Sequence, residues 1–355
     1  MRSMDRPRGA VFVAPGQPLV MQEFDYPSLA AGEGLVEVLC CTVCGSDLHT
    51  LQGKRKVAGP MILGHEVIGR LVEMNGDLRT IEGDLLQTGD RISWGIAASC
   101  DDCFFCRSGL PQKCERLFKY GHQTITSPAP LSGGLATHCQ LVSGTRIIKV
   151  PESLSDEVAC PANCATATVV AAARLAGNCE GKTVAIFGAG MLGLTAAALM
   201  RSRGAAEIIL VDLDPGRLER AAEFGATSTC LDDARQRTGN RGCDLVLEMS
   251  GSTKAVEQGL ANLRIGGRLI LVGSVFPSES LSVAPEDLVR RMIRIEGLHN
   301  YTPADLQVAI EFLAAEGGRF PFESLVSSEY RLSNVHDAVR FAVEERPIRI
   351  SVRPS

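Results

Sequence analysis

The sequence lacks any apolar run long enough to cross a bilayer; its longest small-residue stretch, 164–177, is short and contains Arg174. Its N-terminus has arginines but no apolar segment or cleavage pattern after them, so no export signal is predicted. An excess of positive charge is also lacking, because the formal net charge of −5 argues against a dedicated nucleic-acid binder. We therefore expect a cytoplasmic protein that binds neither membranes nor nucleic acids.

Composition excludes a disordered chain, since 45% of the 355 residues are hydrophobic and 22% are charged. This length favours two domains over one. Cysteine is the unusual residue: there are thirteen, an odd number that cannot pair completely. Without an export signal, such cysteines are expected as metal ligands, catalytic groups or buried thiols rather than as disulfides.

The first part of the chain, 1–160, has short apolar runs separated by Gly and Pro, which predicts an irregular, mostly β domain. Its expected strands are 10–13, 34–39, 67–73 and 90–93.

From about Pro161 to 299, apolar strand runs alternate with amphipathic segments, which indicates an α/β domain with a doubly wound parallel sheet. The predicted strands are 183–187, 207–212, 245–249 and 268–273, and the predicted helices are 191–203, 215–224 and 253–263. In the remaining segment, 300–355, we expect a helix over 303–316 and a strand at 348–352.

A glycine-rich segment, Gly188-Ala-Gly190-Met191-Leu192-Gly193, follows the strand 183–187 and opens the next helix. Its glycines allow a tight turn and a close approach of backbone to pyrophosphate at the helix N-terminus. Asp212 ends the next strand about 20 residues on, where a carboxylate accepts hydrogen bonds from a ribose. The alternative is a glycine-rich turn that binds nothing. Asp212 favours NAD over NADP because it repels a 2′-phosphate, although Arg217 lies nearby in the sequence.

Four cysteines at close spacing, Cys100, Cys103, Cys106 and Cys114, form the strongest motif of the chain. Four thiolates surround a tetrahedral Zn²⁺ completely, which predicts a structural site. An iron–sulfur cluster uses similar ligands, but the spacing differs from that of ferredoxins. Disulfides and four unrelated buried thiols are the remaining alternatives.

A second, looser set consists of Cys44, His65 and Cys164. Two thiolates and an imidazole leave one position of a zinc ion open, as a catalytic site requires. Taken singly, Cys44 is equally compatible with a buried thiol and His65 with a core histidine.

Together these motifs resemble the zinc-dependent medium-chain alcohol dehydrogenases, along essentially the whole chain. The resemblance implies a GroES-like catalytic domain, completed by the C-terminal segment, and a Rossmann domain. A narrower resemblance is to dehydrogenases associated with phosphonate catabolism. The segments that carry the family resemblance are 44–49, 64–69, 89–91, 100–114, 133–136 and 188–193; those that carry the narrower one are 163–168, 273–277 and 296–301.

The family resemblance implies a role for each candidate residue. Cys44, His65 and Cys164 would hold a catalytic zinc, with Glu66 beside it or as an exchangeable ligand. Ser46 would take the alcohol proton and pass it, through the cofactor ribose, to His49, for which a surface histidine is the alternative.

Further roles follow from the same resemblance. Asp47 would orient His65. Cys164 is preferred to Cys160 as third ligand because Thr168, four residues on, falls where the family contacts nicotinamide, and Gly273 is assigned to the cofactor site as well. The seven cysteines outside both sets are expected as buried thiols.

The sequence thus predicts an oxidoreductase that moves a hydride between NAD and a small polar alcohol or carbonyl compound, such as a hydroxyalkyl phosphonate or a polyol. The alternative is a catalytically silent sensor or scaffold that binds nucleotide and zinc. A homodimer or homotetramer is expected, with cross-subunit pairing near 268–275. Candidate substrate contacts are Trp94, Ile96, Lys119, Tyr120, His122, Arg290, Arg291, His299 and Asn300.

Overall fold

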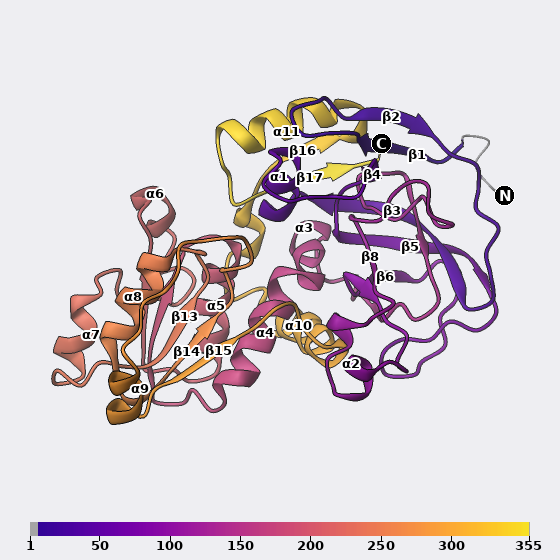
Figure 1. Cartoon of the computed structure of the whole chain (residues 1–355). Helices are drawn as coiled ribbons and strands as arrows, with labels where there is room; N and C mark the ends of the chain where they lie inside the picture. Colours follow the sequence, from indigo (N-terminus) through magenta and orange to yellow (C-terminus); the bar gives the residue numbers. More distant parts are fainter. Residues whose placement is uncertain (1–5, 355) are drawn as a thin grey trace. The chain divides into compact units, whose positions relative to one another are not determined.

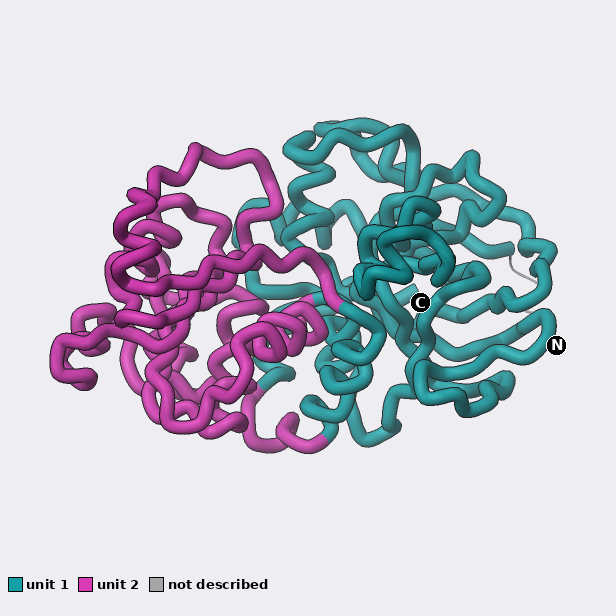
Figure 2. The backbone as a smooth tube through the Cα atoms, turned by 60° about the horizontal axis from the view of Figure 1, so that its bottom comes forward, with its two compact units in different colours: residues 1–164, 302–314, 322–355 teal, residues 165–301, 315–321 magenta. Residues whose placement is uncertain are grey.

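In the computed structural model, which describes residues 6–354, the chain forms two compact units (Figure 2). Unit 1 contains the chain up to Cys164 together with 302–314 and the segment from Phe322 onward; unit 2 contains 165–301 and 315–321. The first boundary therefore lies at residue 164 and not at the predicted 160. Two hydrogen bonds hold the intervening residues in unit 1: Cys160 Sγ donates to the Cys40 carbonyl (3.2 Å) and Asn163 Nδ2 to the Trp94 carbonyl (2.7 Å).

Unit 1 is mostly β, as predicted (Figure 1). Its main sheet has the order β10-β6-β5-β3-β17-β16, and β9 pairs with β3 as well. The long central strands β3 and β5 run antiparallel from the pair Glu33–Asn75 to the pair Thr42–Glu66. The strands are β3 (Glu33–Thr42), β5 (Glu66–Asn75), β6 (Arg91–Trp94), β9 (His138–Leu141), β10 (Ile147–Lys149), β16 (Val326–Arg331) and β17 (Arg349–Arg353).

The C-terminal segment completes this sheet, because β17 pairs with β3 on one side and with β16 on the other. The predicted final strand is thus confirmed at the sheet's interior. Smaller elements of unit 1 are β1 (Arg8–Phe12), β2 (Val20–Glu23), α1 (Gly45–Leu51), β4 (Met61–Ile62), β7 (Ala97–Ala98), α2 (Phe104–Arg107), η1 (Pro111–Lys113), β8 (Phe118–Lys119), α3 (Asp156–Ala159), η2 (Cys160–Asn163), η3 (Phe322–Leu325), η4 (Leu332–Asn334) and α11 (Val335–Glu344). Helix α10 (Pro303–Glu316) confirms the predicted helix.

Unit 2 is a five-stranded parallel sheet of order β12-β11-β13-β14-β15. Strand order reverses at β11, so right-handed crossovers to β12 and β13 leave the sheet on opposite faces, which is the doubly wound arrangement predicted. Its elements are α4 (Ala165–Ala176), β11 (Thr183–Phe187), α5 (Met191–Ser202), β12 (Glu207–Val211), α6 (Pro215–Leu218), α7 (Asp232–Arg237), β13 (Cys243–Glu248), α8 (Thr253–Asn262), β14 (Leu263–Leu271), α9 (Pro285–Arg291) and β15 (Arg294–Gly297).

Two sequence predictions for unit 2 are wrong in detail. The helix predicted over 215–224 ends at Leu218, after which Ala221 N donates to Leu218 O and Phe224 N to Ala221 O in tighter, three-residue turns. The strand predicted from 268 begins at Leu263 and is interior, paired by β13 and β15. Residues 268–271 pair with β13 on one side and β15 on the other, while the predicted cross-subunit pairing near 268–275 stays a prediction.

No single helix of the described residues is long and apolar enough to cross a bilayer; one bent pair, Asp156–Asn163 with Ala165–Ala176, meets that criterion jointly. The second member of the pair, α4, is twelve residues long and mostly buried. Apolar segments of this length are typical of core helices.

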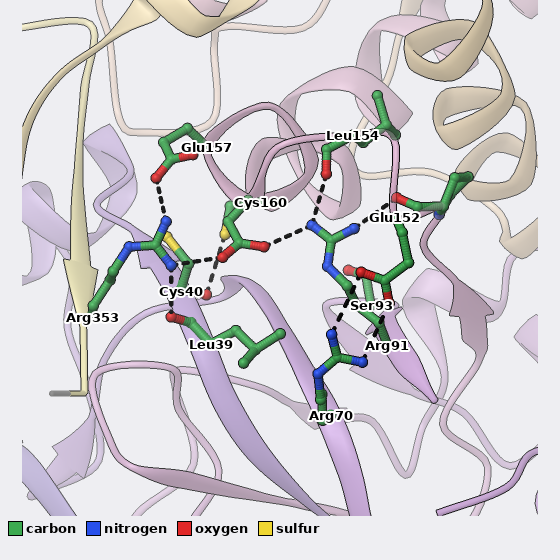
Figure 3. Close-up of polar contacts among 12 residues, drawn as sticks. Leu39, Cys40, Arg70, Arg91, Ser93, Glu152, Leu154, Glu157, Cys160 and Arg353 are labelled. Atoms are coloured by element: carbon green, nitrogen blue, oxygen red, sulfur yellow. Dashed lines mark hydrogen bonds and ion pairs between the residues drawn. The ribbon is translucent and has the colours of Figure 1, made fainter. Parts of the chain in front are cut away.

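A network of arginines and carboxylates ties the C-terminal strand to α3 (Figure 3). Arg91, which is 6% exposed, donates to the carbonyls of Pro151 (2.7 Å) and Leu154 (2.9 Å) and to Asp156 (2.6 Å). Arg353 donates to the other oxygen of Asp156 (2.6 Å). The two guanidinium groups lower the pKa of Asp156 although burial opposes the shift. Each charge is thus compensated where water is largely absent.

We predict that Arg91→Met destabilises unit 1 by about 2–4 kcal/mol, because it leaves two carbonyls without their donor and Asp156 with only one of its two guanidinium partners. Arg70→Met is the matched control: Arg70 is 41% exposed and pairs with Glu152, so its loss costs less than about 1 kcal/mol. Urea unfolding followed by fluorescence of the single tryptophan, Trp94, reports on unit 1. Equal shifts for the two variants would contradict the prediction.

Candidate active site and metal centres

Three predicted ligands, Cys44, His65 and Cys164, meet in unit 1, with one donor atom from each residue lying within 4.8 Å of the others. Cys44 immediately precedes α1, His65 precedes β5, and Cys164 follows η2. Two thiols and one imidazole fit tetrahedral zinc with a fourth position left for another ligand.

The Asp47 carboxylate links two of these segments. It is 1% exposed; its Oδ2 accepts a hydrogen bond from Cys44 N (2.9 Å) and its Oδ1 from Gly64 N (3.2 Å). The same Oδ1 lies 3.3 Å from His65 Nδ1. Asp47 therefore fixes the backbone beside Cys44 and the ring of His65 together.

Because Nδ1 of His65 faces Asp47, Nε2 is the ring atom available to a metal. Nε2 lies 3.3 Å from Ser46 Oγ, so the predicted proton-transfer serine is next to the three-residue group. His49 lies on the same helix, three residues after Ser46. Its pKa is lowered by burial and by Lys54.

Cys44 and Cys164 shift the pKa of each other's thiol in opposite directions. A hydrogen bond from Cys164 lowers the pKa of Cys44, with Arg349 and His65 assisting, and raises the pKa of Cys164. The Asp47 charge raises the pKa of His65 to about 10 against the opposing effect of burial. A divalent cation that displaces these protons would restore charge balance within the group.

Glu66 is not a member of the three-residue group. Its side chain is fully buried, and its oxygens accept hydrogen bonds from Arg349 Nε (2.8 Å), Arg349 Nη2 (2.9 Å) and Thr42 Oγ1 (2.7 Å). Of the two sequence interpretations, the geometry favours a neighbour of the metal over a ligand. Burial nevertheless raises the pKa of Glu66.

Sequence reasoning missed Arg349, whose Nη2 also lies 3.5 Å from Cys44 Sγ. A signal was present, since an arginine inside the apolar terminal strand must find a buried anion. Glu66, in a buried strand beside a metal ligand, is the anion with which Arg349 pairs.

The four-cysteine lobe is also brought together, with the sulfur atoms of Cys100, Cys103, Cys106 and Cys114 within 4.8 Å of one another. The sulfur–sulfur distances include 3.3 Å (Cys100–Cys114), 3.5 Å (Cys103–Cys106) and 4.0 Å (Cys100–Cys106). They bracket the edge of about 3.8 Å expected for a tetrahedron with Zn–S bonds of about 2.3 Å. Backbone N–H groups of Cys100 and Arg116 donate to the sulfur of Cys114, and that of Glu115 donates to the sulfur of Cys103. A backbone hydrogen bond from Asp102 lowers the pKa of Cys100 to about 6. The site fits closed, structural zinc.

The glycine-rich turn of unit 2 lies between β11 and α5, as predicted. A Cβ on Gly193 would lie 1.6 Å from the Gly188 carbonyl oxygen, and Gly188 has φ +103. Gly190 is the N-cap of α5, which begins at Met191. Asp212 accepts hydrogen bonds from Ala189 N (2.6 Å) and Asp214 N (2.9 Å), so its carboxylate borders the turn.

Another carboxylate at this sheet edge, Glu248, did not emerge from the sequence. It is fully buried and accepts hydrogen bonds from Ser250 N (2.6 Å), Gly251 N (2.6 Å) and Ser274 Oγ (3.1 Å). The predicted Gly273 packs here, since a Cβ on it would lie 2.5 Å from Gly251 N. Thr168 is in the first turn of α4, and Arg217 pairs with Asp214 (3.6 Å).

Two predicted substrate contacts in unit 1 are core residues instead. Trp94 is 2% exposed and Tyr120 is 1% exposed. The Tyr120 hydroxyl group forms a hydrogen bond of 2.6 Å with Thr145 Oγ1. Lys119 and His122, on either side of Tyr120, are half-buried. Burial, aided by Arg55, lowers the pKa of Lys119, and burial lowers the pKa of His122.

Two known families match the chain. Residues 30–152 match the family of the alcohol dehydrogenase GroES-like domain, and residues 192–315 match the zinc-binding dehydrogenase family. An alcohol dehydrogenase of Geobacillus stearothermophilus is 33% identical over 85% of this chain and 87% of its own length. A sorbitol dehydrogenase of Bacillus subtilis is 31% identical over 90% and 88%. The crystal structure of an alcohol dehydrogenase from Thermotoga maritima superposes with a TM-score of 0.93 at 30% identity, over 99% of this chain and 100% of the other.

Fold and site together define an oxidoreductase that acts on CH–OH donors with zinc and a nicotinamide dinucleotide. The chain belongs to the zinc-dependent medium-chain alcohol dehydrogenase family. The narrower resemblance, to dehydrogenases of phosphonate catabolism, is carried by none of these matches.

We predict that Cys103→Ser lowers the zinc content from about two ions per chain to about one, because three thiolates hold a closed site poorly. The protein keeps the zinc bound by Cys44, His65 and Cys164. Cys230→Ser, at an exposed cysteine outside both groups, is the control and keeps about two ions. Elemental analysis after exhaustive dialysis measures both. A wild-type protein with one zinc would contradict the assignment of two sites.

Proposed function

We propose that this protein is an NAD-linked, zinc-dependent dehydrogenase of a small polar alcohol, with hydroxyalkyl phosphonates and polyols as the classes to test first. The observation that carries the proposal is the convergence of Cys44, His65 and Cys164 within 4.8 Å. The reaction moves two electrons, as a hydride, from the carbinol carbon to NAD⁺, and releases one proton as the carbonyl compound forms. The same site serves the reverse reaction.

Zinc, when bound, supplies the Lewis acidity that lowers the pKa of an alcohol toward neutrality. The residues of this chain do the rest. Ser46 Oγ, 3.3 Å from His65 Nε2, is placed to accept the hydroxyl proton beside the metal ligands. His49 would carry that proton onward. Asp47 keeps the His65 ring oriented, and Arg349 compensates the charge of Glu66.

The preference for NAD rests on Asp212. Its two oxygens accept hydrogen bonds from backbone N–H groups around the glycine turn, and each keeps a lone pair for a ribose hydroxyl. A negative charge held at this point opposes a 2′-phosphate. Arg217, whose side chain pairs with Asp214, offers only partial compensation.

Cys44→Ala should lower turnover by about 1,000-fold or more, since it removes a ligand of the ion that activates the alcohol. NADH binding, measured by titration calorimetry, should stay unchanged because Cys44 belongs to unit 1 and the glycine turn to unit 2. Cys139→Ala, at a buried thiol outside both metal groups, is the control and keeps its activity. Retained turnover in Cys44→Ala would reject the zinc mechanism.

Asp212→Ser should shift the ratio of kcat/KM for NADP to that for NAD by about tenfold or more, equivalent to about 1.4 kcal/mol, because the repulsion of the 2′-phosphate disappears. Asp232→Ser, at an exposed acid on α7, should leave the ratio unchanged. Steady-state kinetics with each cofactor on one alcohol measure the ratio. A wild-type enzyme that already prefers NADP would contradict the assignment of this role to Asp212.

A further inference from the structure

Three basic side chains gather beside the metal ligands of unit 1: Arg55, Lys119 and His122. Arg55 Nη1 lies 2.8 Å from His122 Nε2, and the His122 ring lies 5.8 Å, centroid to centroid, from the ring of the ligand His65. Lys119 is close enough to Cys164, Asp47 and Arg55 to interact electrostatically with all three. The proton-transfer mechanism uses none of these basic residues.

The turn that carries Lys119 and His122 is packed directly on the ligand segment. Gly121 has φ +73, and a Cβ there would lie 2.9 Å from the Gly64 carbonyl oxygen and 3.3 Å from His65 Cβ. Hydrogen bonds from Gly121 N to Ser132 O (2.7 Å) and from His122 N to Lys119 O (3.1 Å) fix the turn. Glycine is thus required for the close approach, and His122 is held next to His65 by backbone geometry.

The hydrogen bond between Arg55 and His122 determines the tautomer of His122. A guanidinium group only donates, so His122 Nε2 must accept, and the ring proton must be on Nδ1. His122 Nδ1 is buried and has no hydrogen-bond partner among the described residues. A buried N–H donor without an acceptor is costly, which marks a place for an oxygen atom of a ligand.

The local charges point to the sign of that ligand. Two thiolates balance a divalent zinc, and Arg349 balances Glu66. Asp47 then remains as one negative charge close to the ammonium group of Lys119. No carboxylate lies within ion-pair distance of Lys119 in the described part of the chain. An ammonium group without a paired carboxylate, beside the unsatisfied N–H of His122, favours an anionic ligand over a cationic one.

We propose that Arg55, Lys119 and the Nδ1–H of His122 form a specificity subsite for an oxyanion, so that the substrate is a small alcohol with a phosphonate, phosphate or carboxylate group. This inference rests on the proposed function, since it places the anionic end of the alcohol that the zinc site oxidises. Guanidinium and ammonium groups bind such oxyanions through charge-assisted hydrogen bonds. A hydroxyl group of a neutral alcohol could accept the hydrogen bond from His122, but it would bring no negative charge to Lys119.

Kinetics on matched alcohols test the subsite. At constant ionic strength, the wild-type enzyme should have a higher kcat/KM for 2-hydroxyethylphosphonate or glycolate than for neutral propane-1,2-diol. Arg55→Gln and Lys119→Gln should each raise KM for the preferred anionic alcohol by about 10- to 100-fold, the range for one charged hydrogen bond, with kcat little changed. Their kcat/KM for the diol should stay within about twofold.

Lys56→Gln is the matched control, because Lys56 is an exposed cation adjacent to Arg55 in the chain. It should change neither KM. His122→Ala should weaken binding of the anionic alcohol, whereas His122→Asn, which keeps an N–H near the position of Nδ1, should restore part of it. Equal effects of Lys56→Gln and Arg55→Gln, or a wild-type preference for the diol, would overturn the proposal.

Binding without turnover separates this proposal from the proposed function. Titration calorimetry of ethylphosphonate, which has no hydroxyl group, into the zinc-loaded protein saturated with NADH measures the oxyanion subsite alone. Saturating NADH blocks the dinucleotide site, which also binds phosphates. Binding that Arg55→Gln and Lys119→Gln weaken by tenfold or more, in a protein that oxidises no alcohol, would support the subsite and reject the dehydrogenase function. Turnover of neutral alcohols with no ethylphosphonate binding would do the reverse.

Discussion

The site of unit 1 depends on one buried carboxylate. Asp47 is surrounded by protein, so its charge persists only if donors surround it. Cys44 N and Gly64 N donate hydrogen bonds to Asp47, and His65 Nδ1 lies 3.3 Å from it; these groups come from two segments separated by α1 and β4. Satisfying Asp47 and assembling the metal ligands are therefore the same structural event. An amide in its place would bring two N–H groups where only acceptors fit.

A second buried pair explains why the C-terminal segment returns to unit 1. Glu66 follows the ligand His65 directly, and an unpaired carboxylate there would be costly. The compensating cation, Arg349, lies on β17, which pairs with β3 beside β5. Strand pairing thus brings a guanidinium across 283 residues of chain to the metal ligands. The split of the catalytic unit in sequence is the consequence of this charge balance as well as of sheet completion.

How well each feature could be predicted depends on how far apart in the sequence its interacting residues are. The four-cysteine lobe and the glycine turn are local motifs whose spacing encodes their geometry, and the structure assembles both. Partners distant in sequence escaped prediction: Arg349 for Glu66, Arg55 for His122, and Ser274 for Glu248. Boundaries also depended on tertiary contacts, since hydrogen bonds from Cys160 and Asn163 decide where unit 1 ends. The helix α6 also ends earlier than the sequence predicts, because local turns follow Leu218.

Both units use carboxylates for the same physical task. The carboxylates of Asp47 and Glu248 can only accept hydrogen bonds. Each accepts them from backbone N–H groups of loops, which have no partners in a helix or a sheet. Loops held in this manner need no further side chains for their conformation. His122 contrasts with them, because its packing leaves the Nδ1–H donor without an acceptor among the described residues, next to the guanidinium group of Arg55. Folding alone gains nothing from a buried donor left unsatisfied, and an oxygen atom of a bound anion would accept its hydrogen bond.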